Sequence, residues 1–144
     1  MKPQLGSHRA RAKSEVGGVI RYEGQGELMD YKALVDTKQG FTVDLLGQSP
    51  TSGYIVSLPG YTRRIDVATF NDEDVKDYAS QYFYELSESG RYIGAWLENN
   101  TVWLDISENF HVLELAQSVG VERNQIAIWD VVNETEIATG GNGN

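Results

Sequence analysis

A single β-hairpin over residues 91–107 constrains the fold of this chain more than any other segment. Two runs of alternating apolar and polar residues flank Asn99-Asn100, a pair that tolerates the positive φ of the two-residue primed turns that close hairpins. Such a turn fixes the register and places Trp96 opposite Trp103. Because side chains alternate across a sheet, this register sorts the hairpin residues into two faces.

The two predicted faces of the hairpin differ in chemistry. One face is entirely apolar and is predicted to be core: Ile93, Ala95, Leu97, Val102, Leu104 and Ile106. The other face carries aromatic rings and carboxylates: Tyr92, Trp96, Glu98, Thr101, Trp103 and Asp105. Large apolar side chains on one surface usually have a role, and Trp and Tyr are common interface anchors. The second face is therefore predicted either to bind a partner or to be covered by residues 28–45 or the N-terminal arm.

The order of the predicted elements indicates an α+β fold. Strands are expected over residues 41–45, 54–58, 63–69, 91–98, 101–107 and 125–132, and helices over residues 71–90 and 108–119. Asn71 is the expected N-cap of the first helix, with Asp74 at the capping-box position, and Gly90 is its expected end. Two amphipathic helices against a mostly antiparallel sheet would form a two-layer sandwich.

Alternation in the last predicted strand adds a third tryptophan to the aromatic face. Ile126 and Ile128 point to one side of this strand, and Trp129 points to the other. If the two isoleucines join the core that faces the helices, Trp129 lies on the same face as Trp96 and Trp103. One β-bulge would break this pattern.

The charge of −9 is unevenly distributed along the chain. Residues 1–64 hold nine Lys and Arg against six Asp and Glu, whereas residues 65–144 hold three against fifteen. We divide the chain into a basic, glycine-containing flexible arm (1–27), an α+β domain (28–132) and a Gly/Asn-rich tail (133–144). The acidic half would repel nucleic acid and attract basic protein surfaces. The expected partner-binding residues are Tyr92, Trp96, Glu98, Trp103, Asp105 and Trp129 on the aromatic face, and Asp72, Glu73, Asp77 and Glu88 on the acidic helix.

Several classes of function receive no support from the composition. The chain has no cysteine, no apolar run near the ~20 residues of a membrane span and no apolar region of a secretory signal, so neither a membrane span nor secretion by a signal peptide is expected. Residues 71–74 lack the glycine and the closing glutamate of a calcium loop, and no cofactor or metal is predicted. No nucleophile is placed beside His111, so no catalytic residue is assigned.

The only enzymatic alternative uses the carboxylates of Glu98 and Asp105. They share the tryptophan face but lie about three residue pairs apart, which is ~10 Å and near or past the upper limit for an inverting glycosidase. This alternative, a small carboxylate-dependent enzyme, is the least favoured. Direct nucleic-acid binding by Arg9, Arg11 and Lys13 of the arm is a second minor alternative.

Five segments resemble an uncharacterised small domain of phage and actinobacterial mobile-element proteins. They are Phe41-Thr42, Ser52-Gly53-Tyr54-Ile55-Val56-Ser57, Tyr92-Ile93-Gly94-Ala95-Trp96, Val102-Trp103-Leu104-Asp105-Ile106-Ser107 and Asn124-Gln125-Ile126-Ala127-Ile128-Trp129-Asp130. The similarity covers about residues 41–130, and Ala95 replaces the second glycine of that domain's hairpin motif. The resemblance implies a phage or mobile-element setting, and with it a location in a host cytoplasm or a virion. It transfers no functional residues.

These observations predict a non-enzymatic accessory protein of a phage or mobile element that acts by binding another protein. In one form it is an acidic inhibitor of a host defence system. In the other it is a virion or assembly component, with the arm and the tail as tethers. The sequence leaves the identity of the partner and the oligomeric state open.

Overall fold

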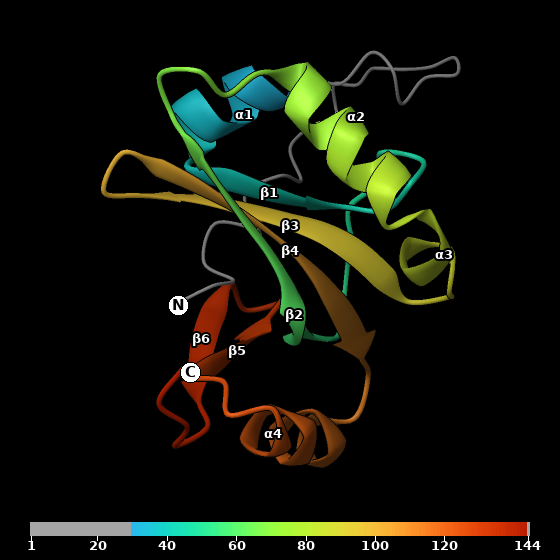
Figure 1. Cartoon of the computed structure of the whole chain (residues 1–144). Coiled ribbons are helices and arrows are strands. Elements are labelled where there is room, and N and C mark those ends of the chain that lie inside the picture. Colours follow the sequence, from blue (N-terminus) through green and yellow to red (C-terminus); the bar gives the residue numbers. More distant parts are fainter. Residues whose placement is uncertain (1–29, 144) are drawn as a thin grey trace.

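The computed structural model describes residues 30–143, and it confirms the α+β class (Figure 1). The helices are α1 (Tyr31–Lys38), α2 (Asp72–Gln81), α3 (Phe83–Leu86) and α4 (Leu113–Glu122). The strands are β1 (Gly40–Val43), β2 (Tyr54–Asp66), β3 (Arg91–Glu98), β4 (Thr101–Phe110), β5 (Ala127–Asp130) and β6 (Thr135–Ala138). The six strands form one antiparallel sheet in the order β1-β3-β4-β2-β5-β6.

The predicted register of the hairpin is confirmed. Asn99 and Asn100 both have positive φ, and Trp96 pairs with Trp103 across β3 and β4. The face predicted to be core packs under α1, α2 and α3, where all its residues are buried except Leu97, which is half-buried. A second apolar cluster joins Val56 of β2 and Ile128 of β5 to α4 at the other end of the sheet.

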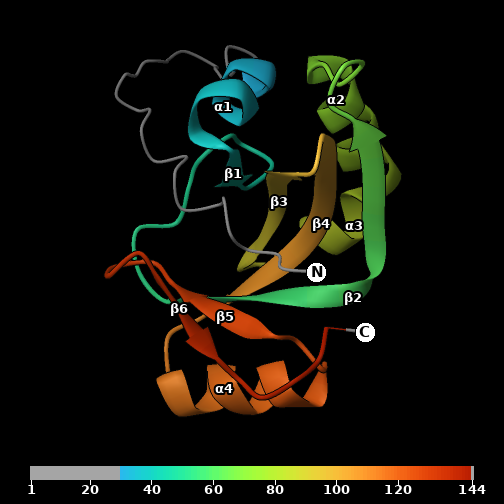
Figure 2. The same cartoon turned by 90° about the vertical axis from the view of Figure 1, so that its left-hand side faces the viewer.

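β2 is one long strand that bends sharply, which corrects the prediction of two strands separated by Pro59-Gly60 (Figure 2). The pairing with β4 shifts between Leu58, opposite Ile106, and Arg63, opposite Leu104. Both parts of the strand pair with β4, so the proline and glycine form a bulge rather than a terminus. The bend curls the sheet and brings β5, β6 and α4 to one end of it.

The N-terminus of α2 follows the predicted capping box. The Asn71 side chain accepts hydrogen bonds from the amides of Glu73 and Asp74, and the Asp74 carboxylate accepts one from the Asn71 amide. The helix ends earlier than predicted, at Gln81, and α3 follows as a separate turn. The two helices are separated at Tyr82. The ring of this residue packs against the rings of Tyr61 and Tyr78.

The second predicted helix begins later than residue 108. Residues 108–110 belong to β4, because they pair with residues 54–56 of β2. Gly120 does not end α4 but lies inside it, where a Cβ atom would be 2.9 Å from Thr139 Cγ2 and 3.0 Å from Ile128 Cγ2. The absent side chain lets this helix approach the sheet closely.

The C-terminal segment predicted as a tail contains β6, which pairs with β5 along its whole length. The amide of Gly143 also donates a hydrogen bond to the carbonyl of Asn124. The predicted arm, residues 1–27, lies outside the described residues. Within residues 30–143, no helix is long and apolar enough to cross a membrane.

Candidate functional site

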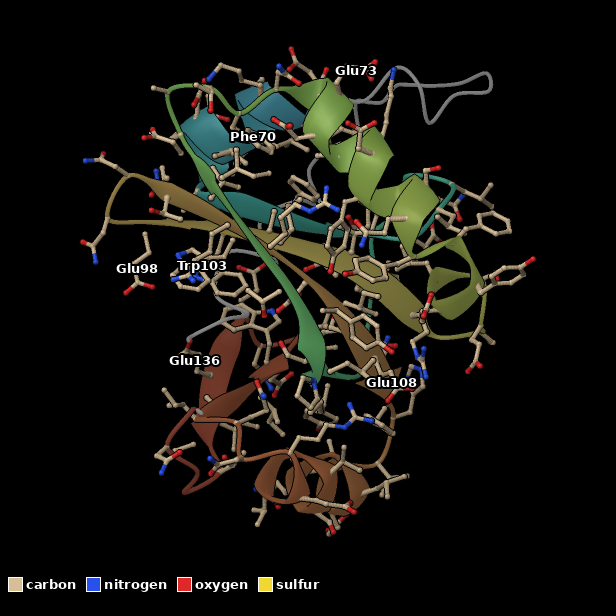
Figure 3. All side chains as sticks on the ribbon, in the orientation of Figure 1. Phe70, Glu73, Glu98, Trp103, Glu108 and Glu136 are labelled. Atoms are coloured by element: carbon tan, nitrogen blue, oxygen red, sulfur yellow. The ribbon has the colours of Figure 1, made fainter. Side chains whose placement is uncertain are left out.

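The aromatic face predicted for the hairpin lies on the side of β3 and β4 away from α1 and α2, where Figure 3 shows Trp103 and Glu98. The rings of Trp96 and Trp103 stack with 5.8 Å between centroids and 7° between planes. Trp129 of β5 lies on this face as well. It pairs with Ile55 of β2, and its neighbour Ile128 points to the opposite side of the strand, where it packs against α4.

The members of this face differ widely in exposure. Trp96 and Asp105 are each 3% exposed, and Trp129 is 6% exposed. Tyr92 and Trp103 are half-buried, and Glu98 is exposed near the turn. The predicted binding residues of this face therefore reach solvent mainly through Glu98, Tyr92 and Trp103, while the other three are buried.

Asp105 lies where the pairing between β4 and β2 is interrupted by the bulge. Ser57 Oγ donates a hydrogen bond of 2.9 Å to Asp105 Oδ2. Burial raises the pKa of the Asp105 carboxyl to about 6, and the hydrogen bond from Ser57 opposes this shift only in part. A buried carboxylate with one hydrogen bond is incompletely compensated for its loss of water.

Further buried polar atoms without partners lie on the same sheet face as Asp105. Within residues 30–143, the buried Thr42 Oγ1, Ser107 Oγ, Trp96 Nε1 and Trp103 Nε1 have no hydrogen-bond partner. Thr42 of β1 pairs with Gly94 of β3, and Gly94 in turn pairs with Asp105 of β4. Ser107, two residues further along β4, pairs with Ser57 of β2. We refer to these residues together as the Asp105 cluster: Thr42, Ser57, Trp96, Trp103, Asp105 and Ser107.

The predicted acidic residues of α2 and of the segment after α3 make different contacts. Asp72 Oδ1 accepts a hydrogen bond of 3.0 Å from the Lys32 amide and so ties α2 to α1. Glu73 and Asp77 are exposed one turn apart on α2, and Figure 3 shows Glu73 at the outer side of this helix. Glu88 is exposed and lies 3.4 Å from the Arg91 guanidinium.

Two adjacent aromatic residues on α3 were not among the predicted site residues. Phe83 is 54% exposed and Tyr84 is 85% exposed, with 6.2 Å between their ring centroids. Their neighbour Tyr82 instead points inward, where its ring contacts the rings of Tyr61 and Tyr78. A signal was present in the sequence: three aromatic residues in succession cannot all lie on one face of a helix. We call Glu73, Asp77, Phe83, Tyr84 and Glu88 the α2–α3 surface.

Glu108, labelled in Figure 3, forms ion pairs with two arginines in a structural network. Its two carboxylate oxygens accept from Arg91 Nε at 2.7 Å and from Arg123 Nη2 at 2.5 Å. Burial alone would raise the pKa of Glu108, but the hydrogen bonds from Arg123 and Arg91 lower it. The network connects the end of α4 to β3 and β4.

Neither carboxylate of the enzymatic alternative has a carboxylate or imidazole partner among the interactions of the described residues. Glu98 is exposed beside the turn, opposite Thr101, whereas Asp105 is buried opposite Gly94. In the described part of the chain, no three His, Asp or Glu side chains gather in a way that could hold a metal ion.

Nothing among protein-family models, curated proteins or solved structures matches this chain. The resemblance to a phage and mobile-element domain therefore stays a prediction from the sequence.

Proposed function

We propose that this protein is a non-enzymatic accessory protein that binds a basic protein partner through the α2–α3 surface. The observation that carries this proposal is the pair of adjacent exposed aromatic side chains on α3, Phe83 and Tyr84, in a segment that also carries exposed carboxylates on α2 and after α3. Aromatic anchors surrounded by polar residues are typical of the energetic centre of a protein interface.

Charge supports a basic partner rather than an acidic one. Residues 30–143 hold seven Lys and Arg against 18 Asp and Glu, a net charge of −11. Within α2 itself, Lys76 is the only Lys or Arg, and Arg63 of β2 contacts this helix at Tyr78 and Gln81. A surface of this sign accelerates encounter with a positively charged protein and repels nucleic acid.

The setting that we propose is a phage or a mobile element, and the resemblance of five sequence segments supports it. In such a setting, a basic surface that evolved to bind nucleic acid is a suitable target for an acidic protein. We therefore propose an inhibitor of a host system that acts on nucleic acid, with the acidic surface occupying the place of phosphate groups.

Affinity capture from host cells, with the tagged full chain as bait, tests this proposal. Proteins captured by the wild type should be lost with Phe83→Ala/Tyr84→Ala, because a central anchor contributes about 2 kcal/mol or more to binding. The matched control is Val112→Ala/Leu115→Ala, which removes apolar side chains of similar exposure beside and on α4. Capture that survives the α3 substitutions but fails with the α4 substitutions would contradict the proposal.

A further inference from the structure

The outer edge of β6 is open in the part of the sheet that the structure describes. β1 and β6 are the two edge strands of this sheet. All four residues of β1 are buried, whereas three of the four residues of β6 are exposed. An exposed edge presents unpaired amide and carbonyl groups and is a template for a further strand. β6 is therefore the place where this sheet can accept one.

The hydrogen bonds between β5 and β6 show which backbone groups of β6 point outward. The amide of Thr139 donates to the carbonyl of Ile126, in register with the β5–β6 ladder. Because bonded and non-bonded pairs alternate in an antiparallel ladder, Ile137 also bonds to β5. The amides and carbonyls of Glu136 and Ala138 then point away from β5, toward the position of an additional strand.

The two sides of this edge differ in chemistry. Ile137 packs on the apolar cluster under α4, whereas Glu136, labelled in Figure 3, pairs with Trp129 and is exposed on the other side. Residues 112–143 hold five Asp and Glu against one arginine, Arg123, which is bonded to Glu108. A fitting strand therefore carries a cation opposite Glu136 and an apolar side chain opposite Ile137.

The N-terminal arm of the chain, which lies outside the described residues, contains one segment with this pattern. Residues 1–27 carry five Lys and Arg against three Glu. Only in Val19-Ile20-Arg21-Tyr22 is a cation of the arm flanked by β-branched and aromatic residues, which favour strands. We infer that residues 19–22 add to the outer edge of β6 as an antiparallel strand, with Arg21 opposite Glu136.

One register satisfies both sides of the edge. With Arg21 opposite Glu136, antiparallel pairing places Ile20 opposite Ile137, where it extends the apolar cluster under α4. The remaining pairs are Val19 with Ala138 and Tyr22 with Thr135. In this register the arm residues opposite Glu136 and Ala138 are the ones that exchange hydrogen bonds with their outward groups.

The arm of the same chain is a better occupant than a separate molecule. An edge of four residues buries far less than the roughly 1,200–2,000 Å² of a specific interface between proteins. A tethered segment needs less, because its effective concentration is on the order of mM. A second copy would also bring together two bodies that each have a net charge of −11 over residues 30–143.

The connection between the arm segment and the body is long enough. Residues 23–29 separate Tyr22 from Asp30, and eight residue steps reach about 26 Å. Five strand spacings put the two edges of the sheet at most ~24 Å apart, and the curl of the sheet shortens this path. Figures 1 and 2 both show β6 below α1, the helix that follows Asp30.

Disulfide trapping in the full chain tests the inference, and the chain has no cysteine of its own. Ile20→Cys/Ile137→Cys places two thiols in a non-hydrogen-bonded pair, where Cα atoms lie ~4.5 Å apart, within the span of a disulfide. Mild oxidation should form a disulfide within one chain, identified by mass spectrometry of the unreduced digest. The matched control is Ile20→Cys/Ala138→Cys, whose second thiol lies one residue away on the other face and should react about tenfold or more slowly.

Hydrogen exchange of the Ala138 amide gives a readout without cysteine. This amide points away from β5, so slow exchange in the wild type requires a further strand. Arg21→Glu should accelerate its exchange about fivefold or more, because two carboxylates then face each other. Arg21→Glu/Glu136→Arg reverses the pair and should restore the protection.

Three results would each overturn the inference. They are equal rates of disulfide formation at positions 137 and 138, a disulfide that joins two chains, and a wild-type Ala138 amide that exchanges as fast as in an unstructured peptide. The measurements involve neither a cellular partner nor the α2–α3 surface, so they succeed or fail independently of the proposed function.

Discussion

Asp105 and Gly94 face each other across β3 and β4, and a Cβ atom on residue 94 would lie 2.5 Å from Asp105 Oδ1. Real Cβ atoms essentially never approach another heavy atom below 3.0 Å. The conformation of the buried carboxylate therefore depends on the absence of a side chain at this one position of β3. This relationship links the sequence of the hairpin directly to the geometry of the Asp105 cluster.

Gly94→Ala should lower the free energy of unfolding by about 1–3 kcal/mol, the usual cost of forcing extra volume into a packed site. The Asp105 carboxylate would have to move, and its hydrogen bond from Ser57 would be strained or lost. Urea denaturation of Gly94→Ala, of Asp105→Ala and of the double variant measures the coupling free energy between the two residues. Alanine at 94 should cost less when Asp105 is absent, and strictly additive effects would contradict this contact.

The ionisation of Asp105 should make stability depend on pH. Burial raises the pKa of this carboxyl from 3.8 to about 6, so the folded state favours its protonated form. The resulting stabilisation is complete below about pH 4 and is lost as the pH rises through 6. The wild type should therefore lose stability relative to Asp105→Asn between about pH 4 and pH 8, by roughly 2–3 kcal/mol. A difference that stays constant over this range would show that Asp105 is not buried as described.

Two leucines on the core face of the hairpin should differ in their contribution to stability. Leu104 is fully buried, and Leu104→Ala should cost about 2–5 kcal/mol. Leu97 is half-buried beside the turn, so Leu97→Ala should cost clearly less. Thermal and chemical denaturation of both variants would check this, and equal costs would mean that the end of the hairpin is more deeply packed than the structure shows.

Short-range chemistry explains which parts of the fold could be predicted. Asn99-Asn100 fixes the hairpin register through its own turn, and Asn71 with Asp74 fixes the start of α2, so both were predicted correctly. The continuous path of β2 through Pro59-Gly60 was missed, because only its pairing with β4 keeps it a single strand. The strand in the C-terminal segment likewise depends on β5, which no local pattern reveals.

The candidate site residues likewise separate into those that local sequence patterns predict and those whose exposure depends on tertiary packing. Charge along the sequence selected Glu73 and Asp77 as partner-binding residues, which stays a prediction, and alternation placed Asp105 on the same face as the tryptophans. Alternation assigns a residue to a face but does not say how deeply that face is buried, so the sequence left open whether this face is exposed or covered, and the structure buries Trp96 and Asp105. Phe83 and Tyr84 were missed because their exposure results from the helix break at Tyr82.

A basic partner that docks on the α2–α3 surface should associate at a rate set by charge, which kinetic measurements at different salt concentrations can show. With a captured partner, the association rate should fall steeply as salt rises from about 50 to 300 mM, because exposed charges are screened within ~8 Å at physiological ionic strength. Glu73→Lys/Asp77→Lys should slow association about tenfold or more with little change in dissociation, whereas Glu114→Lys/Glu122→Lys on α4 should associate nearly as the wild type. Association that is independent of salt, or that both pairs of substitutions slow equally, would contradict the account.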